Sequence, residues 1–487
     1  MAIFFIGLLL TLLATANPQD LVRERERQLT PQVNGASRAP SALIDGVQEA
    51  WVARYNGSAN ASDGALATAV DGSGNVYVTG WSAGSGTGFD YATVKCNSAG
   101  QEQWVARYNG PGNSDDYAQA ITIDSSGNVY VTGFSVGSGT GFDYATIKYN
   151  STGEQQWVAR YNGPGNDIDE AIAIAVDSSG NVYVSGDSTG AGMPFDFDYA
   201  TIKYDSVGQE QWVARYDTGG IDDVAAIAVD GSGNVYVAGL SSFGYATIKY
   251  NPSGQQQWAS RYQGSGNDTD GATAIALDHS GNAYVTGFSV GSGGDYDYAT
   301  IKYNSMGQEQ WVARYNGPGN DWDLAEHIAV DSSGNVYVTG NSVGTTYPDY
   351  DYATIKYNSA GQMQWVARYN GPSNGEDDIS GLAIDHSGNI YVTGSSDGAN
   401  TLPDYATIKY NSAGIEQWVA RYDGPASSYD IPRAIAVDGS GNVYVTGNSF
   451  GLGSDYDYAT IKYISRPIPT PRLRPTPRPR PTSSLRP

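Results

Sequence analysis

The sequence predicts an all-β fold, an eight-bladed β-propeller of four-stranded antiparallel blades. Three observations carry this prediction. A tryptophan marker recurs eight times at spacings close to 53 residues. Each period holds four short strand patterns separated by turn signals, which is typical of a propeller blade. The chain is also rich in Gly (62) and Tyr (37), and no segment has a sustained helical period. The markers are Trp51, Trp104, Trp157, Trp212, Trp258, Trp311, Trp365 and Trp418.

The third repeat illustrates the four strands. AIAIAVD (171–177) leads through a tight turn to NVYVSG (181–186), and DYATIKY (198–204) and QWVARY (211–216) follow. The first strand has one branched face and one small, alanine-rich face, which suits an inner strand between neighbouring blades. The Asp-x-Ser-Gly-Asn turn supplies a carboxylate for turn N–H groups and a Gly for positive φ.

The order of the strands predicts how the ring closes. The propeller region, 51–463, begins with an outermost strand (51–55) and ends with three inner strands (433–463). The first strand can therefore complete the last blade and leave no open sheet edge. Eight complete blades result; the alternative is a seven-bladed ring.

The repeated segments AIAVDSSGNVYV (173–184) and DYATIKYNSAG (351–361) resemble the bacterial β-propeller repeat family called SBBP. The resemblance extends over 51–463 and recurs eight times, although the family name refers to seven blades. It implies a propeller fold and an exported or cell-surface setting, and it implies no activity.

The two ends of the chain differ from the repeats. Residues 1–16 are apolar and end in Ala14-Thr15-Ala16, which predicts a signal peptide rather than a short membrane anchor, since a spanning helix needs about 20 residues. Residues 17–50 are polar and predict a flexible lead-in. Residues 464–487 are rich in Pro and Arg and predict a disordered tail. We therefore expect a secreted, periplasmic or cell-surface protein, with no transmembrane segment in the mature chain.

Charge excludes one class of partner. Residues 51–463 hold 17 Lys and Arg against 46 Asp and Glu, a net charge of −29, which argues against binding nucleic acid. All eight lysines occupy one repeat position and eight arginines another. We expect them to pair with carboxylates or to cover Tyr rings. Cys96 stands where the other repeats carry Tyr and is expected to be a buried, inert thiol.

The outer-to-inner loops and the loops between second and third strands should share one acidic face. Three of the former carry Asn-Asp-x-Asp, whose oxygens are candidate calcium ligands. The complete calcium-loop pattern is missing, so turn capping is the competing interpretation and we expect no metal. The calcium candidates are Asp167, Asp169, Asp268, Asp270, Asp321 and Asp323.

Function is the least determined property. The Gly-x-x-x-Trp spacing resembles a docking motif of eight-bladed quinoprotein dehydrogenases, but blade-to-blade packing explains it without a cofactor. His279, His327 and His386 form no catalytic arrangement. The sequence favours a monomeric, non-catalytic binding or structural scaffold without a cofactor, with a protein or carbohydrate ligand on the acidic face. The alternative is a propeller enzyme, quinoprotein-like or a hydrolase or lyase, with a site at the central channel.

Overall fold

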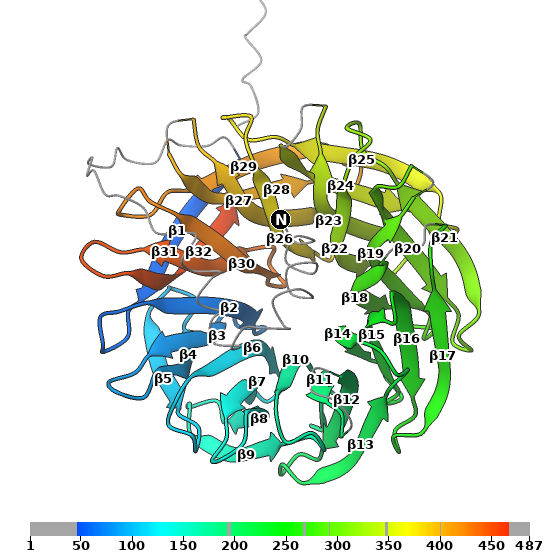
Figure 1. The fold of residues 1–487 in the computed structure, drawn as a ribbon. Helices are drawn as coiled ribbons and strands as arrows, with labels where there is room; N and C mark the ends of the chain where they lie inside the picture. The colour runs from blue at the N-terminus through cyan, green and yellow to red at the C-terminus, as the bar shows by residue number, and fades with distance from the viewer. Residues whose placement is uncertain are drawn as a thin grey trace, which may run out of the picture.

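The computed structural model describes residues 46–191, 196–265, 269–291, 293–345, 349–399 and 401–466. These residues form an eight-bladed β-propeller in which eight four-stranded antiparallel sheets surround one axis (Figure 1). The predicted fold is confirmed, and the seven-bladed alternative is wrong. No helix among the described residues has the length and apolar character needed to cross a membrane.

The first four blades follow the chain in order. Blade 1 consists of β2 (Asp63–Val70), β3 (Val76–Ala83), β4 (Phe89–Cys96) and β5 (Glu102–Tyr108). Blade 2 consists of β6 (Asp116–Ile123), β7 (Val129–Val136), β8 (Phe142–Tyr149) and β9 (Gln155–Tyr161). Blade 3 consists of β10 (Asp169–Val176), β11 (Val182–Thr189), β12 (Phe197–Tyr204) and β13 (Glu210–Tyr216). Blade 4 consists of β14 (Asp222–Val229), β15 (Val235–Ser241), β16 (Gly244–Tyr250) and β17 (Gln256–Tyr262).

The last blade takes its outer strand from the start of the chain. Blade 5 consists of β18 (Gly271–Leu277), β19 (Ala283–Val290), β20 (Tyr296–Tyr303) and β21 (Glu309–Tyr315). Blade 6 consists of β22 (Asp323–Val330), β23 (Val336–Val343), β24 (Tyr350–Tyr357) and β25 (Met363–Tyr369). Blade 7 consists of β26 (Asp377–Ile384), β27 (Ile390–Asp397), β28 (Pro403–Tyr410) and β29 (Glu416–Tyr422). Blade 8 consists of β30 (Asp430–Val437), β31 (Val443–Phe450), β32 (Tyr456–Ser465) and β1 (Val47–Tyr55).

The ring has two different ends. The short Asp-x-Ser-Gly-Asn and Asn-Ser-Ala-Gly turns lie at one end, which we call the turn face, and the longer connections lie at the other, the loop face. In the first turn, Asp71 Oδ1 accepts hydrogen bonds from the N–H groups of Ser73 and Asn75, each at 2.9 Å. Gly74 has a φ of 75°, as this turn requires. The turn chemistry expected from the sequence is therefore present.

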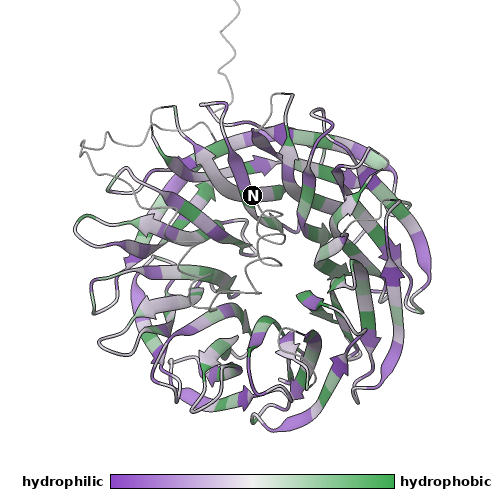
Figure 2. Cartoon of the chain, in the orientation of Figure 1, coloured by the Kyte–Doolittle hydropathy of each residue, from purple (hydrophilic) through white to green (hydrophobic). Residues whose placement is uncertain are grey.

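Neighbouring blades pack through repeated contacts. Gly381 occupies the small-residue position of β26, and a Cβ there would lie 2.8 Å from Ile435 of blade 8, so small and branched faces oppose each other. The Trp51 ring of blade 8 donates from Nε1 to the Ser98 carbonyl of blade 1 at 3.1 Å. Within blade 1 the Nζ of Lys95 lies 5.0 Å from the centre of the Tyr77 ring, and it donates to the Ser151 carbonyl of blade 2 at 3.1 Å. Hydrophilic residues concentrate on the outermost strands, such as β13 and β17 (Figure 2).

The ring closes between β1 and β32, which pair in an antiparallel register with Tyr55 opposite Tyr458. β1 begins at Val47, four residues before the expected boundary at Trp51, and β32 continues to Ser465, beyond 463. Val47 is buried in the core between blades 7 and 8, which is why the strand extends to it. Residues 47–50 thus belong to the propeller rather than to a flexible lead-in. The proposed signal peptide lies outside the described residues.

Candidate functional site

The repeated charges of the loop face form a structural network. Arg107 on β5 donates from Nη2 to Asp90 of its own blade at 2.9 Å and from Nη1 to the Tyr55 hydroxyl of the preceding blade at 3.2 Å. Equivalent Arg–Asp ion pairs occur in seven blades. In blade 4, Gly244 stands in place of the Asp, and Arg261 keeps the bond to the serine carbonyl that the other arginines also make, here that of Ser241. These arginines hold adjacent blades together and are therefore committed to the fold.

A ring of buried aspartates lies at the start of the inner strands. Asp116 is fully buried, and its Oδ2 accepts a hydrogen bond from the Gly110 N–H at 2.7 Å. Burial raises the pKa of Asp116 to about 6, against the opposing effect of hydrogen bonds from Ser135 and Gly110. The equivalent residue of blade 8, Asp430, has its pKa raised by burial to about 7. These carboxylates cap the loops that lead into the inner strands.

The calcium candidates separate into two environments. Asp169, Asp270 and Asp323 belong to the buried ring, where Asp169 accepts from the Gly163 N–H at 2.6 Å. Asp167 is exposed, and Asp321 is partly exposed and accepts from the Trp322 N–H. Asp268 lies outside the described residues. The closely spaced carboxylate groups of the described chain contain none of these candidates.

Two carboxylate triads occur instead on the loop face. Their oxygens lie within 4.8 Å of one another, and each triad arises where Asp follows the Arg-Tyr pair of the outer strand. Five other blades carry Asn and one carries Gln at that position. The Asp in these two blades is therefore the feature of the sequence that could have indicated the triads. Arg215 and Arg421 already pair with one member of each triad. The triads are Asp198, Asp217 and Asp222, and Asp404, Asp423 and Asp430.

A second set of positions distinguishes the blades. Each inner strand has a β-bulge near its loop-face end, and all eight bulge residues differ. By contrast, the third strand reads Ala-Thr-Ile-Lys in seven of the eight blades. The bulge residues are Leu66, Gln119, Ile172, Ala225, Thr273, Glu326, Ser380 and Arg433. The scaffold is thus uniform, while the residues beside the axis vary.

Blades 6 to 8 place polar residues at this level. Asn341 on β23 donates from Nδ2 to Glu326 at 3.0 Å and to Asp378 of blade 7 at 2.5 Å. Its Oδ1 accepts from the Ile379 N–H at 2.8 Å. Asp378 and Arg433 are both exposed on innermost strands, so solvent reaches them. Burial, together with the nearby Asp378, raises the pKa of Glu326 well above its usual value.

Blades 3 and 4 place an acidic pair at the same level. Asp187 on β11 accepts from the Val224 N–H of blade 4 at 2.7 Å and shares a hydrogen bond with Asp223. Burial, followed by the charge of Asp223, raises the pKa of Asp187 well above its usual value. The pair therefore retains a proton at a higher pH than an ordinary carboxyl group does. Glu170 lies opposite Asp187 in the pairing of β10 with β11. We call Glu170, Asp187, Asp223, Glu326, Asn341, Asp378 and Arg433 the axial cluster. Sequence reasoning missed it.

The three histidines and the single cysteine considered in the sequence analysis lie in different parts of the ring. His327 follows Glu326 on β22, and burial lowers its pKa to about 4, so it is neutral at pH 7. His279 and His386 occupy Asp-x-Ser-Gly-Asn turns on the turn face. Cys96 is buried, as expected, and burial raises the pKa of its thiol to about 11. These four residues are distributed over both ends of the ring and are not assembled into one site.

The fold, the turns and the uniform blades define the chain as an eight-bladed propeller built from internal repeats. The β-propeller repeat named SBBP matches residues 103–137, 156–192, 310–348, 364–400 and 417–452. The chain thus carries SBBP-type β-propeller repeats. Each match begins on the outer strand of one blade and ends after the second strand of the next, so the sequence repeat is offset from the structural blade by one strand.

Other proteins are similar to this chain over shorter or more distant matches. An uncharacterized WD repeat-containing protein, L264, of Acanthamoeba polyphaga mimivirus is 27% identical over 158 residues, 24% of this chain and 11% of that protein's length. A Bacteroides caccae protein of unknown function is 12% identical with a TM-score of 0.35, covering 60% of this chain and 94% of that one. The polysaccharide lyase Uly1 is 11% identical with a TM-score of 0.43, covering 71% of this chain and 89% of that one.

Proposed function

We propose that this protein is an exported, non-catalytic binding module that holds a cationic, amine-bearing ligand at the loop-face end of its axis. The observation that carries the proposal is that residues around the axis differ between blades, at the bulges of the inner strands and at nearby positions, whereas the third strands are nearly uniform. Binding residues are commonly presented in this way by an otherwise rigid scaffold.

The charge of the axial cluster supports a cationic ligand. The cluster contains five carboxyl groups and one guanidinium group, and the surrounding propeller carries a net charge of −29. These carboxyls lie on several blades around one axis, and an approaching cation favours the ionised form of Asp187 and Glu326, whose pKa values are raised, so that their charges attract it. Asp378 is solvent-exposed and accessible to a ligand. Arg433 would disfavour a cation beside it, and its position would fix the orientation of the ligand.

The hydrogen bonds of the cluster support recognition rather than chemistry. Asn341 is held by the Ile379 N–H, and Asp187 is held by the Val224 N–H. Such contacts orient recognition groups before a ligand arrives, which lowers the entropic cost of binding. The competing proposal is an enzyme that uses the Asp187–Asp223 pair as a proton donor and acceptor, since the two carboxyls share a hydrogen bond.

Spermine is a suitable probe for calorimetric titration at low and high salt. We expect saturable binding that weakens with salt, and a several-fold loss of affinity in Glu326→Gln. Glu309→Gln is the matched control, because Glu309 is exposed at the turn-face end of β21. Arg433→Ala should bind spermine more tightly, while Arg466→Ala at the turn face should not. Equal affinity in all four variants would reject the proposed site.

Export and catalysis have separate tests. Mass spectrometry of the protein from its native source should show a chain beginning after Ala16, and an intact Met1 would contradict export by this route. If Asp187→Asn leaves spermine binding intact and abolishes a hydrolase or lyase activity found by substrate screening, the enzyme proposal replaces the binding module.

A further inference from the structure

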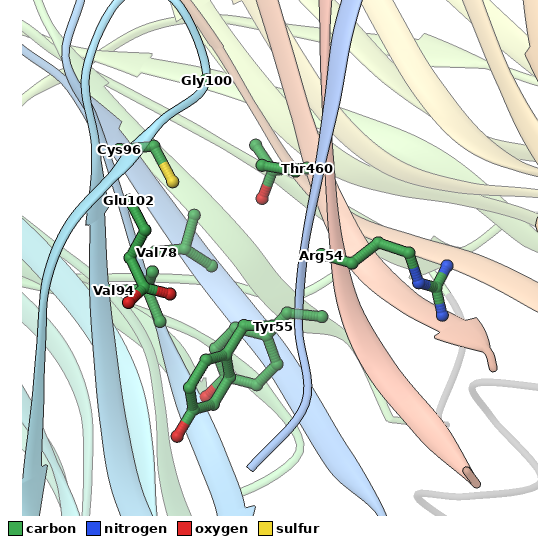
Figure 3. Close-up of a pocket in the computed structure, with 10 residues that line it drawn as sticks. Arg54, Tyr55, Val78, Val94, Cys96, Gly100, Glu102 and Thr460 are labelled. Carbon is green, nitrogen blue, oxygen red and sulfur yellow. The ribbon is translucent and has the colours of Figure 1, made fainter. Parts of the chain in front are cut away.

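A cavity of about 180 Å³ lies at the seam where the ring closes, between blades 8 and 1 (Figure 3). Its walls include Ala53 and Thr460 from blade 8 and Val94, Cys96 and Glu102 from blade 1. Figure 3 shows the Cys96 side chain directed toward the cavity, while Arg54 points away from it. The cavity is lined by residues of the second to outermost strands of the two blades and by none of the innermost strands.

The cavity has an identifiable origin in the sequence. The third strand of blade 1 reads Ala-Thr-Val-Lys-Cys, whereas the other seven read Ala-Thr-Ile-Lys-Tyr. In the next interface, the Tyr149 ring is buried and lies 6.3 Å from the Trp104 ring of the preceding blade. At the seam, Cys96 replaces this Tyr and Val94 replaces the neighbouring Ile. Two truncations in one strand thus open the same space.

The missing group defines the shape and chemistry of the space. Seven interfaces fill it with a phenol ring that is part of the chain, and the tyrosines that do so are Tyr149, Tyr204, Tyr250, Tyr303, Tyr357, Tyr410 and Tyr463. Cavities of about 150 Å³ hold benzene in proteins, so a single substituted ring fits the volume found here. The seam therefore has room for a ring that the chain does not provide.

We propose that this cavity is a binding site for a small para-substituted phenol, which takes the place of the absent tyrosine side chain. The ring packs against Val78 and Val94, as the tyrosine rings do against the corresponding aliphatic residues elsewhere. The hydroxyl group donates to the Glu102 carboxylate at the cavity wall. A free phenol can shift toward this acceptor, whereas a tyrosine ring is fixed by its backbone.

The neutral thiol is compatible with this ligand. Burial raises the pKa of Cys96 to about 11, so the side chain is uncharged at neutral pH and behaves as a small apolar group. The site is independent of the axial cluster and of the function proposed for it. Ligand binding here would reinforce the contact between the first and last strands of the ring, since Ala53, Tyr55 and Thr460 line the same cavity.

The single cysteine of the chain supplies a direct measurement. With p-cresol as the probe, the rate at which methyl methanethiosulfonate labels Cys96 in the full chain should fall at least tenfold at saturation. Ligand-observed NMR should give one site with a dissociation constant on the order of 0.1–1 mM, as expected for so few atoms. An unchanged labelling rate at 10 mM p-cresol, a concentration about tenfold or more above that constant, would overturn the proposal.

Matched variants locate the site. Cys96→Tyr with Val94→Ile restores the sequence of the other seven blades and should abolish p-cresol binding. Tyr149→Cys with Ile147→Val recreates the truncation between blades 1 and 2 and should add a second site. If the filled variant binds p-cresol as well as the wild type does, the site is elsewhere and the proposal is wrong. Circular dichroism before titration establishes that each variant is folded, and Val94→Ile alone, a single added methylene, should weaken binding measurably.

Discussion

Arg54 on the first strand and Asp457 on the last, 403 residues apart in sequence, form an ion pair with Nη2 and Oδ2 2.9 Å apart. The same arginine donates from Nη1 to Ser449 and to the Tyr422 hydroxyl of blade 7. One side chain thus joins the start of the chain, the end of the chain and the neighbouring blade. Each counterpart that forms this ion pair elsewhere does so with an Asp on a strand that a short turn already connects to its own.

Arg54→Ala should therefore destabilise the closure. Removing the guanidinium leaves Asp457, only 5% exposed, without its cation, at a cost of about 2–4 kcal/mol. Urea unfolding measures this loss. Arg160→Ala is the control, because Arg160 makes the equivalent contacts with Asp143 and Ser135 within a continuous blade. Hydrogen exchange in β1 should increase only in Arg54→Ala, and equal exchange in both variants would contradict a special role at the seam.

The buried aspartate ring should reverse the usual effect of mild acid on stability. Burial raises the folded-state pKa to about 6 in Asp116, Asp169, Asp323 and Asp377, above the unfolded value near 3.9. The folded chain then binds more protons than the unfolded chain between pH 4 and 6. The free energy of unfolding should rise as the pH falls from 7 to about 4.5, by on the order of 1 kcal/mol for each group.

The aspartates of the Asp-x-Ser-Gly-Asn turns should set the lowest pH at which acid still stabilises the protein. Although burial acts in the opposite direction, hydrogen bonds from Asn75 and Ser73 keep the pKa of Asp71 below its usual value. Stability from such groups is lost as the pH falls below that value, so unfolding in strong acid should follow the maximum. Asp169→Asn should reduce the slope between pH 7 and 5. A stability that falls steadily from pH 7 downward would contradict this assignment.

The seam also removes one turn and its hydrogen bond. Trp104 Nε1 donates to the Ser151 carbonyl of the next blade at 3.2 Å, whereas Trp418 Nε1 has no partner among the described residues, since the eighth turn is replaced by the two chain ends. Trp104→Phe should therefore cost about 1 kcal/mol more than Trp418→Phe, beyond the similar loss of ring area. Thermal or urea unfolding compares the two, and an equal cost would indicate that the hydrogen bond contributes nothing net.

Calcium should stabilise the protein no more than an equal ionic strength of sodium chloride. In the triad formed by Asp404, Asp423 and Asp430, the Arg421 guanidinium already neutralises Asp404 at 3.1 Å. Thermal melts with calcium and with chelator provide the comparison. A saturating shift at micromolar calcium, lost in Asp423→Asn, would instead identify this triad as a metal site. That substitution restores the Asn found in five other blades.

The features predicted well from the sequence are those whose signal is present in the residues of each repeat. Asp71 and Gly74 define their turn within a few residues. The repeat region begins with an outermost strand and ends with three inner strands, which indicates the pairing of β1 with β32. The start of β1 at Val47 was missed, because its burial depends on Trp418, far away in sequence. The axial cluster was missed for a similar reason. Only the bulge before Ala434 shows that Arg433 is displaced from the strand pairing beside the axis.

Gly46 and Arg466 lie side by side, where the Arg466 N–H donates to the Gly46 carbonyl at 3.0 Å. Both ends of the propeller therefore leave from the turn-face rim of blade 8. A fusion partner or a surface-attachment tag joined directly at Gly46 or Arg466 is held on that side, and the loop face is directed away from it. Immobilisation through Gly46 or Arg466 of a chain trimmed to the propeller should thus leave ligand capture undisturbed, and two such propellers joined at these residues would present their loop faces independently.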